Sequence, residues 1–271
     1  MIDKQTLLSW RDNAPWVNAA QIEQDLIISR ALIEIYSHPL LKNELVFRGG
    51  TALQKCFYNY PTRYSEDLDF VQIKQGPIGH IFDALRSILE PWLGKPNINL
   101  SSGRATQIYR FVSSGIEQQR MRLKIEINTS ENYNILDLAE KLFVLKSNWY
   151  SGNAIIKTYQ VDELMGTKLR ALFQRKKGRD LFDMARAIEL LPINIEKILL
   201  CFNSYLDREG AKISRAEFEK NLTMKKNIIM FKEDMSPLLA DDAQHDFDKD
   251  FNLVMREIIS KLPGEPWKSL A

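Results

Sequence analysis

Residues 47–71 of this 271-residue chain read FRGGTALQKCFYNYPTRYSEDLDFV, and the stretch ends in two closely spaced acids. Polar and apolar residues alternate from Glu66 to Ile73, which predicts a strand that carries Asp67 and Asp69 on the same side. Two carboxylates this close repel each other unless the fold supplies positive charge between them. The pair therefore indicates a site that attracts cations.

A glycine pair precedes these acids. Gly49 and Gly50 stand between a short apolar strand, predicted at 45–47, and a short helix that begins at Thr51. Glycine lets backbone N–H groups approach a phosphate closely, and the N-terminus of the next helix adds a positive dipole. Thr51 can add a hydroxyl, and Lys55, one turn later, would either reach the same phosphates or remain solvated. On its own, such a glycine pair often only satisfies the backbone geometry of a turn. Together with the acids, it predicts a cradle for a triphosphate.

A third acid lies on a later predicted strand, in the run KIEIN. The apolar residues of this strand alternate with polar ones, which places Glu126 on the polar face. Carboxylates are hard oxygen donors that suit Mg²⁺, and two-metal sites for phosphoryl transfer hold their ions about 3.5–4 Å apart. Asp67 and Asp69, with Glu126 from the second strand, are therefore predicted to bind two Mg²⁺ ions.

Other common site motifs are absent from the sequence. The chain contains no Walker A, GxGxxG, HExxH or GxSxG pattern, which removes the motif evidence for P-loop, dinucleotide-binding, zincin and hydrolase functions. An EF-hand is excluded because Phe70 and Val71 occupy positions that need a ligand and a turn glycine. Cys56 and Cys201 lie far apart, so we expect buried free thiols.

The composition is typical of a globular protein, with 45% hydrophobic and 27% charged residues. A net charge of +2 gives little overall attraction to nucleic acid, so any basic surface must be local. No apolar stretch reaches membrane-spanning length and no signal peptide is evident. We expect a cytoplasmic protein without a membrane partner.

The order of elements predicts an α+β fold. Three strand-like runs occupy 98–101, 106–113 and 121–128. From Val161 onward nearly every segment has helical periodicity. We therefore predict a small mixed, largely antiparallel sheet followed by an α-helical C-terminal domain, with domains at 1–155 and 156–271.

Lys168 lies in the middle of an apolar stripe on the predicted helix Val161–Gln174. A lysine on a buried helix face is costly unless it has an anionic partner. One possibility is that its stem lies along a domain seam with its charge in solvent. The other is that it reaches between the two halves of the chain to a triphosphate or a site acid.

A basic turn, residues 175–179, precedes the next predicted helix. Such a charge run is usually a solvated face. Asp180 follows it at the edge of an apolar stripe, so we expect its carboxylate to be partly buried. Asp183, one turn later, is a weaker candidate that could simply pair with Arg179 or Arg186.

Four blocks follow one another along the chain: FRGGTALQK, RYSEDLDF, KIEIN and, last, ELMGTKLRAL with RKKGRDLFDMARA. Together they resemble the AbiEii/AbiGii toxin family of polymerase-β-type nucleotidyltransferases, over about residues 30–190. The resemblance implies Mg²⁺-dependent transfer of a nucleoside monophosphate from an NTP to a hydroxyl. It also implies active-site roles for Lys168 and Asp180, and it matches Glu163 to an acid of the same block.

By the same resemblance, the acceptor is RNA, with tRNA 3′ ends the first guess. The implied biological role is a type IV toxin in abortive infection and phage defence, paired with an antitoxin encoded beside it. Two alternatives stay open: the same chemistry on a small molecule such as an aminoglycoside, and a non-catalytic nucleic-acid-binding module. The basic turn at residues 175–179 favours a polyanionic acceptor, and the intact acids disfavour the non-catalytic module.

Overall fold

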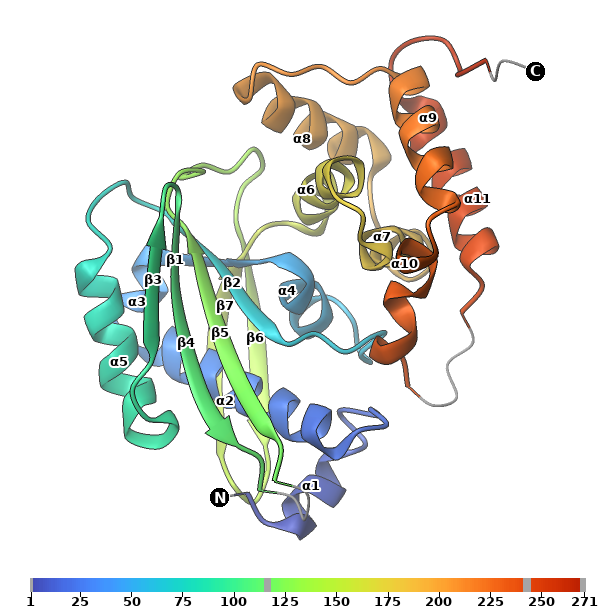
Figure 1. Cartoon of the computed structure of the whole chain (residues 1–271). Coiled ribbons are helices and arrows are strands. Elements are labelled where there is room, and N and C mark those ends of the chain that lie inside the picture. Colours follow the sequence, from blue (N-terminus) through green and yellow to red (C-terminus); the bar gives the residue numbers. More distant parts are fainter. Residues whose placement is uncertain (1, 115–117, 241–244, 269–271) are drawn as a thin grey trace. The chain divides into compact units, whose positions relative to one another are not determined.

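The computed structural model describes residues 2–114, 118–240 and 245–268 (Figure 1). The chain divides into two units, Met1–Tyr159 and Gln160–Ala271. No helix within the described ranges is both long enough and apolar enough to cross a lipid bilayer.

The first unit combines helices with one mixed sheet. Its helices are α1 (Lys4–Trp10), α2 (Ala19–Ser37), α3 (Leu41–Glu44), α4 (Gly49–Cys56) and α5 (Gly79–Leu93). Its strands are β1 (Leu45–Arg48), β2 (Asp67–Gln72), β3 (Asn97–Ser101), β4 (Arg104–Val112), β5 (Arg120–Asn128), β6 (Ala139–Lys146) and β7 (Ser151–Thr158). The strand order is β3-β4-β5-β2-β1-β7-β6.

The sheet confirms the predicted fold class. Among the described strands, β2 with β5 and β1 with β7 pair in parallel, and the other four pairings are antiparallel. Strands β6 and β7 fall where the sequence patterns predict no element. In β6 the apolar residues 142–145 follow one another and so lie on both faces of the strand. Two of them, Leu142 and Val144, are 66% and 47% exposed.

The core lies on one face of the central strands. Leu68 and Phe70 of β2 are buried there, because alternation turns them away from the acids of the same strand. Helix α2 covers this face, with the rings of Tyr36 and Phe70 6.3 Å apart between centroids. Helix α5 adjoins β4, where the Gln107 side-chain amide donates to the Phe82 carbonyl. The opposite face of β2 and β5 is left to polar side chains.

The second unit is helical in its described residues, as predicted. Its elements are α6 (Val161–Gln174), α7 (Gly178–Leu190), α8 (Ile195–Arg208), α9 (Arg215–Lys226), α10 (Ile229–Lys232), the 3₁₀ helix η1 (Glu233–Leu238), α11 (Phe247–Glu257) and the 3₁₀ helix η2 (Ile259–Lys261). Helix α9 begins with a capping box in which Ser214 and Glu217 bond each other's backbone N–H groups. Cys56 and Cys201 are both free, as predicted, although only Cys201 is fully buried.

Candidate functional site

Strands β2 and β5 bring the three predicted acids to one face of the sheet. The two strands run parallel, with Asp67 opposite Lys124 and Asp69 opposite Glu126. Residues directly opposite in a ladder point to the same side, and so do residues two apart on one strand. Asp67, Asp69 and Glu126 therefore share a face, as their spacing predicts. Their role as metal ligands stays a prediction.

Lys124 lies among these acids and was not anticipated from the sequence. Its Nζ is 2.9 Å from Asp67 Oδ2 and 3.3 Å from Glu126 Oε2. The Lys124 side chain is 25% exposed, so this contact is shielded but not closed to water. The signal was present in KIEIN, where Lys124 stands two residues before Glu126 on the same polar face. What was missing was the register that places it opposite Asp67.

Negative charge collects at Asp69. Burial, followed by the charges of Asp67 and Glu126, raises the pKa of Asp69 to about 6, against the opposing effect of Arg48 and Lys124. Burial disfavours the ammonium of Lys124, yet its hydrogen bond to Asp67 and the surrounding carboxylates raise the Lys124 pKa above its ordinary value. The carboxylates thus stabilise the ammonium of Lys124, and the ammonium offsets part of the rise in the pKa of Asp69.

The three acids do not form a ready metal centre in this conformation. Within the described residues, no group of three or more His, Cys, Asp or Glu side chains is arranged to hold a metal ion. The Lys124 ammonium bridges Asp67 and Glu126 and directs one oxygen of each carboxylate toward itself. Any metal bound by these acids must share or replace that contact.

The glycine pair is required by the packing at the start of α4. Gly49 has φ +80°, a left-handed conformation that disfavours any side chain. A Cβ at this position would also lie 2.5 Å from Asp69 Oδ2. A Cβ at Gly50 would collide with the guanidinium of Arg63. The left-handed backbone at Gly49 therefore lets the turn lie directly beside Asp69, whereas a side chain at Gly50 would require the Arg63 guanidinium to shift.

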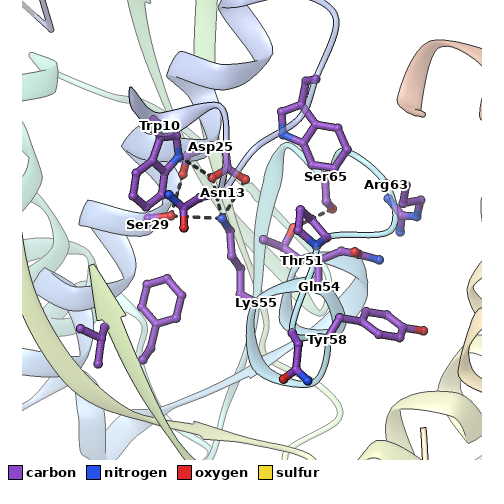
Figure 2. A pocket seen from close by; sticks show the side chains of 15 residues that line it. Trp10, Asn13, Asp25, Ser29, Thr51, Gln54, Lys55, Tyr58, Arg63 and Ser65 are labelled. Atoms are coloured by element: carbon purple, nitrogen blue, oxygen red, sulfur yellow. Dashed lines mark hydrogen bonds and ion pairs between the residues drawn. The ribbon is translucent and has the colours of Figure 1, made fainter. Parts of the chain in front are cut away.

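Thr51 ties the start of α4 to β2. Its buried hydroxyl donates to the carbonyl oxygen of Asp67. The same hydroxyl lies 2.8 Å from Ser65 Oγ (Figure 2). The hydroxyl proton is thus engaged with the backbone beside the acids. A contact between Thr51 and a phosphate stays a prediction.

Lys55 is held in an ion pair with α2. Its Nζ lies 2.7 Å from both carboxylate oxygens of Asp25 and 3.1 Å from Ser29 Oγ (Figure 2). The indole of Trp10 donates to the same carboxylate at 3.0 Å. These residues line a cavity of about 150 Å³. With its side chain only 13% exposed, Lys55 is not the solvated lysine that was one of its two predicted states.

In the second unit, Lys168 finds the anionic partners that its burial demands. Its Nζ is 2.5 Å from Asp183 Oδ2 and 3.5 Å from Asp180 Oδ1. Arg175 adds a two-pronged contact to Asp180, with N–O distances of 2.6 and 2.8 Å. Both aspartates are fully buried. The cluster therefore balances two cations against two carboxylates, as buried charges require.

The predicted minor acids have structural partners. Asp183 forms an ion pair with Lys168, so the predicted arginines, Arg179 and Arg186, are not its only possible partners. Arg179 forms an ion pair with Asp234, and Arg186 forms one with Asp250. Glu163 is fully buried on α6 and accepts a 2.8 Å hydrogen bond from the Tyr205 hydroxyl of α8. Glu163 thus links two helices of the second unit.

Known proteins resemble this chain at the level of a family and of a fold, and two similar structures illustrate the fold. The model of the family described as "Nucleotidyl transferase AbiEii toxin, Type IV TA system" matches residues 30–253. None of the curated proteins compared with the chain matches its sequence significantly.

Both similar structures are distant in sequence. MenT4, a nucleotidyltransferase toxin from Mycobacterium tuberculosis H37Rv, superposes with a TM-score of 0.63 at 14% identity, over 97% of this chain and 91% of that chain. An H. pylori protein described as a nucleotidyltransferase gives a TM-score of 0.57 at 18% identity, over 88% of this chain and 93% of that chain. At such identities these likenesses show a shared fold.

Proposed function

Because the chain belongs to the AbiEii family of nucleotidyl transferase toxins of type IV toxin–antitoxin systems, we propose that it transfers a nucleoside monophosphate from an NTP to an RNA hydroxyl, with Mg²⁺ as its cofactor. Family membership makes the chain a nucleotidyltransferase and implies an NTP substrate and an antitoxin partner. The proposal adds the metal, the residues of the site and the acceptor. The 3′ end of tRNA is the first candidate acceptor, and abortive infection of phage-infected cells is the proposed role.

The observation that carries the proposal is the shared face of Asp67, Asp69 and Glu126 beside a glycine turn. All three side chains offer carboxylate oxygens. These hard donors bind Mg²⁺ more favourably than they bind softer metals. Burial is the main cause of the raised pKa of Asp69, and the charges of Asp67 and Glu126 add to it, so a divalent cation would relieve the part that these charges contribute. We propose that these three acids hold two Mg²⁺ ions. The ions would supply charge neutralisation to the phosphates.

The glycine turn is proposed to receive the triphosphate. Helix α4 begins at Gly49, so the first N–H groups of the helix have no partner within it. Gly49 leaves the backbone uncovered by a Cβ beside Asp69, and Gly50 does so beside Arg63. A phosphate held there would accept from backbone N–H groups and lie next to the acids. In this proposal Thr51 positions the turn, and Lys55 reaches a phosphate only by leaving Asp25.

Lys168 and Asp180 are assigned to the reaction through the family resemblance. Lys168 is proposed to neutralise charge that develops on the phosphates. Asp180 is proposed either to orient Lys168 or to accept the proton of the attacking hydroxyl. These roles are supported by the burial of both residues in one cluster, where the Lys168 ammonium contacts the carboxylates of Asp180 and Asp183.

The RNA acceptor rests on the type IV toxin family rather than on the basic turn. Arg175 and Arg179 are engaged with Asp180 and Asp234, so less of that charge is available than the sequence suggests. The test must therefore also include small-molecule acceptors.

The test is a label-transfer screen with the full-length protein. Each of the four α-labelled NTPs is incubated with Mg²⁺ and either total RNA, purified tRNA or a set of aminoglycosides. We expect label on RNA, strongest on tRNA, and none without Mg²⁺. Label on an aminoglycoside alone would replace the RNA acceptor with a small molecule. RNA binding without any label transfer would contradict the enzymatic assignment.

A further inference from the structure

Lys124 is the cation that joins the acids of the candidate site. It stands on β5 directly opposite Asp67 and two residues from Glu126, and its Nζ contacts both carboxylates. Asp69 stands opposite Glu126, and its charge also acts on this ammonium. Strand alternation places the lysine on the same face as Glu126, and the β2–β5 register brings Asp67 and Asp69 to that face.

Two other cations, Arg48 and Arg104, adjoin the acids. Arg104 contacts Glu126 at 3.1 Å and is 62% exposed, so water screens its charge. Arg48 stands opposite Asp69 in the β1–β2 ladder, and its Nη1 lies 2.8 Å from Glu131. Among the described ion pairs, only that of Lys124 connects β2 to β5 across the acidic face.

We propose that Lys124 is a positioning residue that holds Asp67 and Glu126 together before metal binds, and that a divalent ion must displace its ammonium from at least one of them. The inference rests on the proposed function, since it takes these acids as the metal ligands. It assigns Lys124 two opposing effects: it stabilises the metal-free acids, and it weakens metal binding at them.

The physical reason is competition for the same oxygens. Each carboxylate oxygen that accepts from the ammonium is less available to a cation that needs close oxygen ligands. Removing the ammonium leaves three acids on one face without their shared counter-charge, so their repulsion in the metal-free protein grows. A divalent ion then relieves more repulsion than it does in the wild type. Metal affinity should therefore rise when the lysine charge is removed.

The test compares the wild type with Lys124→Met, which keeps a long stem and removes the charge. Mn²⁺ binding is measured by calorimetry, and thermal unfolding is followed in EDTA and in excess Mg²⁺. We expect Lys124→Met to unfold a few degrees below the wild type in EDTA. We also expect it to gain more from Mg²⁺ and to bind Mn²⁺ on the order of tenfold more tightly. Lys124→Arg should stay near the wild type, because it keeps the charge.

Arg122→Met serves as the matched control, because it removes a more exposed charge from the same strand and face. It should leave both readouts unchanged. If Lys124→Met does not fold, Lys124→Gln takes its place and carries the same expectations.

The outcomes separate this inference from the proposed function. Wild-type protein that binds Mn²⁺, with a Lys124→Met variant that is as stable in EDTA and binds no more tightly, overturns the role of Lys124 alone. Mn²⁺ binding that is absent from the wild type, or unchanged in Asp67→Asn, overturns the metal site itself. Weaker Mn²⁺ binding in Lys124→Met also contradicts the inference, since it would make the lysine a helper rather than a competitor.

Discussion

Asp69 stands directly opposite Glu126 in the parallel ladder of β2 and β5, and the charge of Glu126 adds to the effects of burial and of Asp67 that raise the pKa of Asp69. The repulsion between these acids lowers the stability of the metal-free protein and favours the binding of a cation. The pKa of Asp69 is raised to about 6, first by burial and then by Asp67 and Glu126. Proteins commonly accept such a cost in stability where function requires it.

Asp69→Asn should therefore separate activity from stability. The amide keeps the shape of the side chain and removes a charge that the fold disfavours, so we expect the unfolding temperature in EDTA to be equal to or above that of the wild type. Nucleotide transfer should fall by at least about a hundredfold. Calorimetry and label transfer measure the two effects. A clear loss of stability in EDTA would show that the Asp69 charge supports the fold.

Gly49→Ala should damage both the turn and the acids. The left-handed φ costs about 1–2 kcal/mol for a residue with a side chain, and the new Cβ would press on the Asp69 carboxylate. We expect lower stability in chemical denaturation and strongly reduced transfer. Gly76→Ala is the control, because a Cβ there meets nothing within 4 Å and the φ is not positive. Equal behaviour of the two variants would contradict the requirement for glycine at Gly49.

Lys55→Met should destabilise the first unit by leaving Asp25 buried without its ammonium. Breaking one half of a buried pair typically costs about 3–5 kcal/mol. Asp25→Asn with Lys55→Met should lose much less than the sum of the single changes, because neither charge is then left alone. Denaturation of the four proteins of this double-mutant cycle measures the coupling. Additive losses would mean that the pair contributes little to the fold.

Lys225 predicts a pH effect on the second unit. It is buried and donates to the carbonyls of Leu172 and Phe173 at the end of α6, and burial lowers its pKa to about 8. The folded chain therefore loses this proton more readily than the unfolded chain, whose lysine titrates near 10.5. Between these two pH values the unfolded state binds more protons, so stability should rise with pH. Below pH 8 the cost of the buried ammonium is fully present.

The matched measurement is denaturation of the wild type and Lys225→Met from about pH 7 to 10. The unfolding free energy of the wild type, minus that of the variant, should increase across this interval. A difference that stays constant or falls would contradict the assigned pKa direction.

The site was predictable where it depends on local pattern. The alternation of β2 and β5 places Asp67, Asp69 and Glu126 on polar faces without knowledge of the fold. Lys124 required the register between two strands that are far apart in the chain. The pairing of Lys55 with Asp25 joins residues 30 positions apart, and no local period encodes it.

The same distinction applies to the fold. The C-terminal helices follow from helical periodicity, and Val161–Gln174 is α6 with the predicted bounds. The sequence pattern did not predict the β6–β7 hairpin. Strands are recognised by apolar residues that alternate with polar ones, and in β6 the apolar Leu142 and Val144 are exposed. A strand at the edge of a sheet needs fewer buried side chains, so its sequence carries a weaker signal.

The central claim is that the acids of β2 and β5 support Mg²⁺-dependent nucleotide transfer. The most direct measurement is label transfer from NTP to tRNA across a Mg²⁺ titration, for wild type, Asp67→Asn and Asp83→Asn. Asp83 is an exposed acid on α5 that pairs with Arg86 and lies outside the site. We expect saturable, Mg²⁺-dependent transfer by the wild type and Asp83→Asn and none by a folded Asp67→Asn. Wild-type transfer rates in a folded Asp67→Asn protein would contradict it.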